Sequence, residues 1–153
     1  MENLTGLKED VHKACWQKVQ ARIQQIEQRL IAIREARDQE TKSSVGDKYE
    51  TGRAMMQIEE GKAQAQLANA AADRDALERI DQSKIPERVA SGVLVQTDKA
   101  KYYISIGLGK IQIGEEIVYC ISAKAPIAQA MMGQTMGAAI LFQGRKQTII
   151  ALA

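Results

Sequence analysis

Residues 19–33, VQARIQQIEQRLIAI, decide the first half of the fold. Their apolar side chains recur at alternating steps of four and three residues, at Val19, Ile23, Ile26, Leu30 and Ile33. This spacing is that of a coiled-coil seam, in which one face of a helix packs along a second helix. Upstream, Val11 and Cys15 extend the seam by steps of four. The sequence therefore predicts a long N-terminal helix that needs a helical partner.

A polar segment, residues 41–46, follows the seam and indicates a loop because it consists mainly of Thr, Lys, Ser and Gly. A second helical run extends from about residue 49 to about residue 81, and Glu60 and Arg74 interrupt its apolar face. The other members of that face are Met56, Ala63, Leu67, Ala70 and Leu77. The simplest arrangement is an antiparallel helical hairpin, a coiled coil with arms of about 30 residues and a length of roughly 45 Å.

The second half of the chain is richer in Gly, Val and Ile. Glycine-punctuated, β-rich runs predict strands at residues 92–97, 102–106, 116–121, 138–142 and 148–152. Pro126 and Gly133 indicate the start and end of one short helix between the third and fourth of these strands. Because Pro86 stops a helix, we place a linker at 83–86, between a hairpin over 1–83 and a β-domain over 84–153. The predicted fold class is α+β.

The composition excludes several classes of function. A net charge of +2 is too small to indicate nucleic-acid binding by charge alone, and 4% aromatic residues leave little for a base-stacking surface. The single His12 excludes a multi-histidine metal site, and Cys15 and Cys120 show no CxxC spacing. The chain has no signal-peptide h-region and no apolar run of about 18 residues, so we expect a cytoplasmic protein with no membrane segment.

The segment Gly46-Asp47-Lys48-Tyr49-Glu50 is predicted to form the tip of the hairpin. If a helix restarts there, Asp47 and Glu50 share one face, with their Cβ atoms roughly 5–6 Å apart. Two carboxylates can offer oxygens to a hard cation such as Mg²⁺, but they are too few to hold it alone. The alternative is structural, since acidic residues are favoured in any first helical turn, where Asp47 can cap the amide of Glu50.

Two stretches resemble the bacterial Gre transcript-cleavage and elongation factors. The tip is similar to the family's Gly-Asp-Leu-Ser-Glu, with Lys48 and Tyr49 in place of Leu and Ser. Residues 121–133, ISAKAPIAQAMMG, are similar to the family's Ile-Ser-x-x-Ser-Pro-Ile-Ala-x-Ala-Leu-x-Gly. The order of hairpin and β-domain agrees as well. Further departures are a longer segment before the tip, Thr51 for Asn, Arg53 for an acidic residue, and Gly137-Ala138 for Gly-Asp.

The resemblance implies an FKBP-like β-domain that docks at the rim of the RNA polymerase secondary channel, and a hairpin that enters the channel. Asp47 and Glu50 would then be the catalytic and metal-binding residues, and they would hold Mg²⁺ jointly with the polymerase beside the 3′ end of backtracked nascent RNA. The chain would be an accessory factor to the polymerase's own nuclease and not an enzyme itself. The residues implied to bind the polymerase are Pro126, Ile127, Ala128, Met131 and Gly133.

Lys48 and Arg53, which flank the acidic pair, are candidate contacts to RNA or to the polymerase. Arg34 and Arg37 are candidate RNA contacts because they lie with Arg22 and Arg29 along the first arm, in line with the basic stripe of Gre factors. The alternative is a solvated surface, because exposed Lys and Arg are common. Two other functions stay open. The altered tip motivates a secondary-channel regulator that does not stimulate cleavage, and the regular seam motivates a plain coiled-coil interaction module.

Overall fold

The computed structural model describes residues 3–42 and 46–153, and for residues 40–49 it describes at most the backbone. The chain forms two compact units. Unit 1 comprises Met1–Gln17 and Asp75–Ala153, and unit 2 comprises Lys18–Arg74. The predicted order of a helical hairpin followed by a small β-domain with one short helix is confirmed. The domain boundary at 83/84 and the FKBP-like assignment stay predictions.

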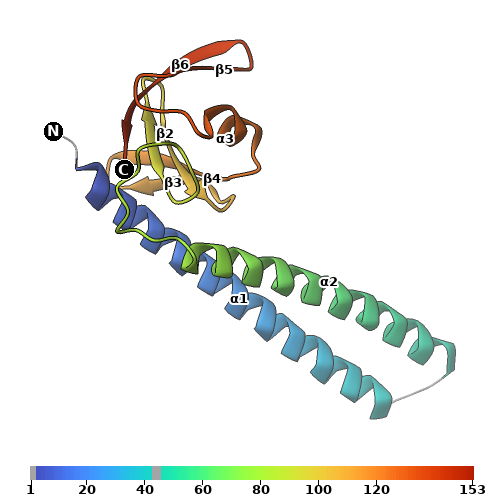
Figure 1. Cartoon of the computed structure of the whole chain (residues 1–153). Coiled ribbons are helices and arrows are strands. Elements are labelled where there is room, and N and C mark those ends of the chain that lie inside the picture. The colour runs from blue at the N-terminus through green and yellow to red at the C-terminus, as the bar shows by residue number, and fades with distance from the viewer. Residues whose placement is uncertain (1–2, 43–45) are drawn as a thin grey trace. The chain divides into compact units, whose positions relative to one another are not determined.

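Unit 2 is an antiparallel pair of helices, formed by most of α1 (Leu4–Lys42) and α2 (Gly46–Glu78) (Figure 1). Ion pairs cross between the arms in opposite numerical order, since Arg22 pairs with Asp73 whereas Arg34 pairs with Glu60. The predicted seam is buried on both arms, at Val19, Ile23, Ile26, Leu30, Ala63 and Ala70. The 4-3 spacing therefore identified the packed face of each helix correctly.

Both helices differ from prediction near the turn. Helix α1 includes Thr41 and Lys42, and α2 begins at Gly46, so the predicted loop at 41–46 is wrong at both ends. Neither Thr nor Lys restricts the backbone in a way that stops a helix, and packing against a second arm extends helices beyond their local preference. Residues 43–45 lie outside the described part of the chain.

Unit 1 is built on a six-stranded sheet with the order β3-β4-β2-β1-β6-β5. Strands β2 and β4 are parallel, and all other neighbours are antiparallel. The strands are β1 (Leu94–Thr97), β2 (Lys101–Ser105), β3 (Gly109–Ile113), β4 (Glu116–Ser122), β5 (Ala139–Phe142) and β6 (Arg145–Leu152). Five of the six overlap predicted strands. Strand β3 was not predicted, because its bounding glycines outweighed the alternation of Ile111 and Ile113 with polar residues.

The core of the sheet domain includes the short helix α3 (Pro126–Met131), whose Ala128 and Met131 are fully buried. They pack in one cluster with apolar residues of the sheet, among them Val95, Ile104 and Ile149. The predicted start of this helix at Pro126 is confirmed. Helix α3 is therefore part of the core as well as part of the surface.

The first turns of α1 belong to unit 1 and contact its sheet. His12 Nδ1 and the Tyr103 hydroxyl share a hydrogen bond of 2.7 Å, and Cys15 Sγ lies 3.3 Å from Cys120 Sγ. The seam prediction placed Cys15 on a helix–helix face. The residue is buried, but the sulfur that it contacts is on strand β4. Seam spacing alone cannot distinguish a helical partner from a sheet partner.

Candidate functional site

The predicted acidic tip coincides with the start of helix α2. Because α2 begins at Gly46, the backbone positions of Asp47 and Glu50 fall within its first two turns, three residues apart on one face. Glu50 is exposed. The side chains of Asp47, Lys48 and Tyr49 lie outside the described residues, so their predicted roles stay predictions. The helix restart on which the shared face depends is confirmed for the backbone.

The tip sequence carries two carboxylates, Asp47 and Glu50. Carboxylate oxygens are the ligands that Mg²⁺ prefers, and Mg²⁺ commonly uses one or two protein carboxylates with its other ligands from water or substrate. Among the described residues, no group of three or more His, Cys, Asp or Glu side chains could hold a metal ion. A Mg²⁺ site that includes Asp47 and Glu50 therefore stays a prediction.

The arginines of α1 are engaged with acidic residues of α2. Arg34 Nε donates to Glu60 Oε1 at 3.1 Å, and Arg37 donates to Glu60 Oε2 at 2.7 Å. Arg29 donates to Glu59 at 2.6 Å. The side chain of Glu60 is only 15% exposed, and its carboxylate binds two cations of the facing arm. These two ion pairs explain why an acidic residue interrupts the apolar seam. Arg34 and Arg37 serve the hairpin itself in this structure, and an additional RNA contact by them stays a prediction.

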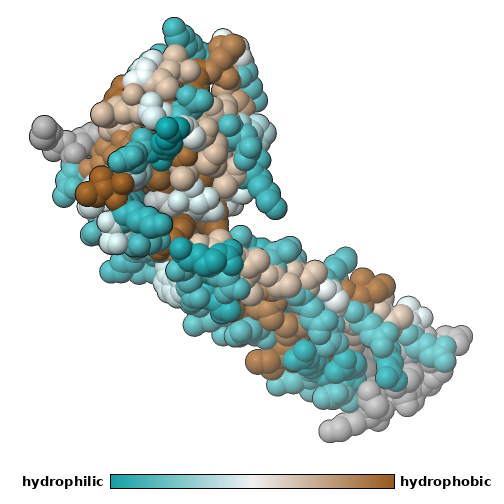
Figure 2. Space-filling view, in the orientation of Figure 1, coloured by the Kyte–Doolittle hydropathy of each residue, from teal (hydrophilic) through white to brown (hydrophobic). Residues whose placement is uncertain are grey.

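An apolar groove runs between the two arms of unit 2. It encloses about 460 Å³ and is lined by Arg29, Ala32, Ile33, Ala36, Gly52, Met55, Met56 and Glu59. Met55 is 63% exposed, and Ile31 and Ile58 are also largely exposed on the same two helices. Figure 2 shows the corresponding apolar patches among the polar surface of the arms. Arg53, a candidate RNA contact, is exposed on α2. Apolar exposure of this kind is typical of a surface that meets a partner.

Helix α3 presents only part of the surface that was predicted to bind the polymerase. Pro126 and Gly133 are exposed and Ile127 is half-buried. Ala128 and Met131 are fully buried, so they shape the helix from within and do not themselves reach a partner. Helix α3 ends at Met131, and Gly133, with a φ of 76°, lies in the following turn, in which the Gln134 N–H donates to the Met131 carbonyl at 3.0 Å. A partner surface here would consist of Pro126, Ile127 and Gly133.

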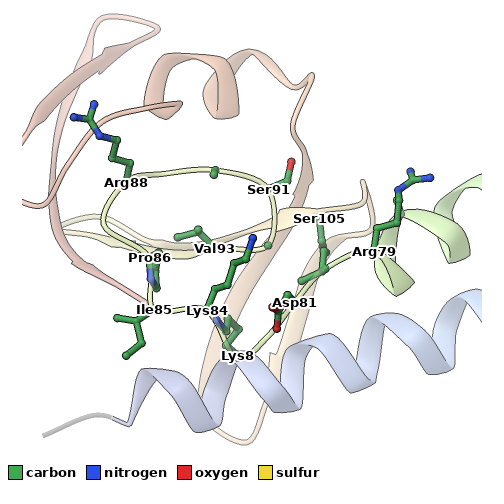
Figure 3. A pocket seen from close by; sticks show the side chains of 14 residues that line it. Lys8, Arg79, Asp81, Lys84, Ile85, Pro86, Arg88, Ser91, Val93 and Ser105 are labelled. Atoms are coloured by element: carbon green, nitrogen blue, oxygen red, sulfur yellow. The ribbon is translucent and has the colours of Figure 1, made fainter.

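A cavity of about 390 Å³ lies in unit 1, between the start of α1 and the segment that follows α2 (Figure 3). Its charged lining residues are Lys8, Arg79, Asp81, Lys84 and Arg88. Figure 3 shows the Lys84 side chain rising toward the 91–93 segment, whereas the side chains of Arg79 and Arg88 point away on opposite sides. Lys8 is only 3% exposed, and sequence patterning gave no signal for this burial.

Burial changes the protonation behaviour of three groups in unit 1. It lowers the pKa of the Lys8 amine, although the carboxylates of Glu9 and Asp81 oppose that effect. It also lowers the pKa of His12, and the charge of Lys8 adds to the effect. Burial raises the pKa of the Tyr103 phenol, with smaller contributions from Cys15 and Cys120. Both shifts favour the neutral forms of His12 and Tyr103, between which the hydrogen bond is made.

No helix in the described ranges is long and apolar enough to cross a membrane. No family model matches the chain, and no curated protein matches it. Among solved structures, GreA factor homolog 1 (Gfh1) of Thermus thermophilus is similar at 15% identity, over 90% of this chain and 94% of that chain, with a TM-score of 0.37. A structure of the transcription factor Gfh1 is similar at 16% identity, over 92% and 94% of the two chains, with a TM-score of 0.36. Likeness of fold at this level does not assign a function.

Proposed function

We propose that this chain is a Gre-like transcription factor that binds RNA polymerase at its secondary channel and stimulates cleavage of backtracked RNA. The observation that carries the proposal is the restart of helix at Gly46, which gives Asp47 and Glu50 neighbouring backbone positions at the turn of an antiparallel hairpin. The motif at residues 121–133, which includes helix α3 of the β-domain, supports the same family resemblance. A match in two separate parts of the chain is more specific than either alone.

The role of the acidic pair follows from the number of ligands that it supplies, which is too small to hold Mg²⁺ without a partner. Asp47 and Glu50 would hold a Mg²⁺ together with ligands of the polymerase, and such an ion activates a water and stabilises a leaving oxygen in phosphodiester hydrolysis. The hairpin would serve to carry the two carboxylates to the polymerase. The ion pairs of Glu60 with Arg34 and Arg37 join the two arms, and they would help to hold the arms in one register.

The test is RNA cleavage in backtracked elongation complexes with the wild-type chain and the Asp47→Ala/Glu50→Ala variant. We expect the wild type to accelerate cleavage and the variant to lose that effect while it still binds the polymerase. Glu27→Ala removes an exposed carboxylate from α1 away from the tip, and this variant should stimulate RNA cleavage as much as the wild type does. Equal stimulation by the tip variant would refute the catalytic role of the pair.

A second candidate is a channel-binding regulator that does not stimulate cleavage. The exposed apolar groove beside Met55 favours it, because that groove could hold the hairpin on a protein surface without any metal. Lys48 and Tyr49 at the tip, where Gre factors have Leu and Ser, point the same way. Polymerase binding that is lost in Met55→Asp, together with no stimulation of cleavage by wild type at any Mg²⁺ concentration, would select this function.

A further inference from the structure

The two cysteines of the chain meet inside unit 1. Cys15 comes from helix α1 and Cys120 from strand β4, and their sulfur atoms lie 3.3 Å apart. No disulfide joins the two residues, and both are buried, at 0% and 1% exposure. A disulfide has a sulfur–sulfur bond of about 2.05 Å, so the two atoms need to approach by only about 1.3 Å. Small side-chain rotations can cover such a distance.

The surroundings keep this pair together and isolated. The Cα of Cys120 is paired in register with that of Tyr103 on the adjacent parallel strand β2, and Tyr103 is hydrogen-bonded to His12, one helical turn before Cys15. Helix α1 is thus attached to the sheet by two neighbouring contacts. The sequence contains no third cysteine. Within one chain, each cysteine can therefore form a disulfide only with the other.

We propose that Cys15 and Cys120 form an oxidation site, at which a small peroxide converts the two thiols into an intramolecular disulfide. The proposal is independent of any role in transcription. Because burial disfavours the reactive thiolate, the reaction requires a local opening of the first turns of α1 and favours a small oxidant such as hydrogen peroxide over a bulky one such as oxidised glutathione.

The reaction balances with hydrogen peroxide as the only added reactant. One thiol attacks a peroxide oxygen, the O–O bond breaks, and a sulfenic acid and one water result. The second thiol attacks the sulfenic sulfur, the S–O bond breaks, and a second water leaves as the S–S bond forms. Both sulfurs are oxidised and both peroxide oxygens are reduced. The protein loses two hydrogen atoms in total.

The product fastens α1 to β4 and closes a chain segment of 105 sequence positions. Cross-linking positions so far apart restricts the unfolded chain strongly, so the oxidised protein should resist unfolding more than the reduced protein. The native contact already holds the sulfurs near bonding distance, so the strain that weakens many engineered disulfides should be small. Reducing compartments would keep the pair as thiols and make the disulfide transient.

The test treats the wild-type protein with hydrogen peroxide, then denatures it in the presence of an alkylating agent and measures its intact mass. We expect a monomer that is lighter by two hydrogen atoms, carries no alkyl group and regains two alkylation sites after treatment with a thiol reductant. The urea midpoint of the oxidised form should be higher than that of the reduced form, as followed by Trp16 fluorescence. Oxidised glutathione at the same concentration should react more slowly.

Other products would overturn the proposal. Two alkylated cysteines after exposure to peroxide, conversion to sulfinic acid, or a disulfide-linked dimer would each show that the pair does not close within one chain. A lower urea midpoint for the oxidised form would show that bond formation distorts unit 1. Cys15→Ala and Cys120→Ala serve as controls. Each variant keeps only one cysteine, so neither should lose two hydrogen atoms as a monomer after exposure to peroxide.

Discussion

Replacing Gly92 by Ala tests the packing of unit 1 at its tightest backbone position. Gly92 has a φ of 87°, and a Cβ atom added there would lie 2.8 Å from Cγ2 of Ile80. The left-handed conformation costs a non-glycine residue about 1–2 kcal/mol, and overpacking costs typically about 1–3 kcal/mol. Alanine returns about 0.4–1 kcal/mol by restricting the unfolded chain. We therefore expect Gly92→Ala to lower the free energy of unfolding by about 3 kcal/mol.

Substitutions at two other glycines separate the cost of the left-handed backbone from the cost of the contact with Ile80. Gly144 also has a left-handed φ, of 75°, but has nothing within 4 Å of an added Cβ, so Gly144→Ala should cost only about 1 kcal/mol. Gly107 has neither a left-handed φ nor a neighbour, so Gly107→Ala should be neutral or slightly stabilising. The difference between Gly92→Ala and Gly144→Ala then measures the overlap with Ile80.

The assay is urea unfolding, followed by the fluorescence of Trp16. This is the single tryptophan of the chain and it lies in unit 1, so its signal reports that unit and not the distal hairpin. In the double variant Gly92→Ala/Ile80→Ala the clash should disappear, which gives a favourable coupling of about 1–3 kcal/mol in a double-mutant cycle. The reasoning is refuted if Gly92→Ala costs no more than Gly144→Ala, or if the coupling is zero.

Three further substitutions address charged and titratable groups. Glu60→Gln should destabilise unit 2 by about 1 kcal/mol, because the substitution removes the carboxylate charge from two arginine hydrogen bonds that water already screens in part. Equal urea midpoints of wild type and variant, followed by circular dichroism, would contradict this. The lowered pKa of His12 means that the unfolded chain takes up a proton first, so the urea midpoint should fall as the pH drops below about 6.5. His12→Gln should weaken that dependence, and an unchanged dependence would exclude His12 as its source. Lys8→Met should raise the urea midpoint of unit 1, because it removes a charge that burial disfavours. The exposed Lys13→Met on the same helix should leave the midpoint unchanged, and a loss of stability in Lys8→Met would show that Asp81 outweighs the desolvation.

The elements that the sequence revealed are those whose signal is local and repeated. The seam from Val19 to Leu30 repeats one spacing over several turns, and Pro126 marks a helix start by its fixed backbone angle. Strand β3 lacked such a signal, because it has only two apolar residues between glycines. The helix ends at the hairpin turn were also misplaced, since Thr41 and Lys42 do not stop a helix and α1 continues through Lys42.

At the candidate tip site, the sequence predicted only the relative backbone positions of the two acidic residues. The spacing of Asp47 and Glu50 is a property of the sequence, and the restart of α2 at Gly46 converts it into a shared face. The partners of Cys15 and Glu60 could not be predicted, because each lies far away in the sequence. An acid in a seam shows that a partner is required but does not identify it, and a buried thiol packs as a small apolar group that gives no sign of its neighbour.

Glu60 also connects the stability of the hairpin with the position of its tip. A polar group in an apolar seam costs stability but selects the one register in which its partners meet it, here Arg34 and Arg37. A slip of one helical turn would move α2 along α1 by about 5.4 Å, which is far more than a Mg²⁺–oxygen distance of about 2.1 Å. Glu60→Leu is therefore expected to keep the free energy of unfolding of unit 2 within about 1 kcal/mol of wild type while register specificity is lost. If the wild type stimulates RNA cleavage, this variant should stimulate it less although both tip carboxylates remain. Full stimulation by Glu60→Leu would show that the apolar seam alone fixes the register and that the ion pairs contribute nothing to the placement of the tip.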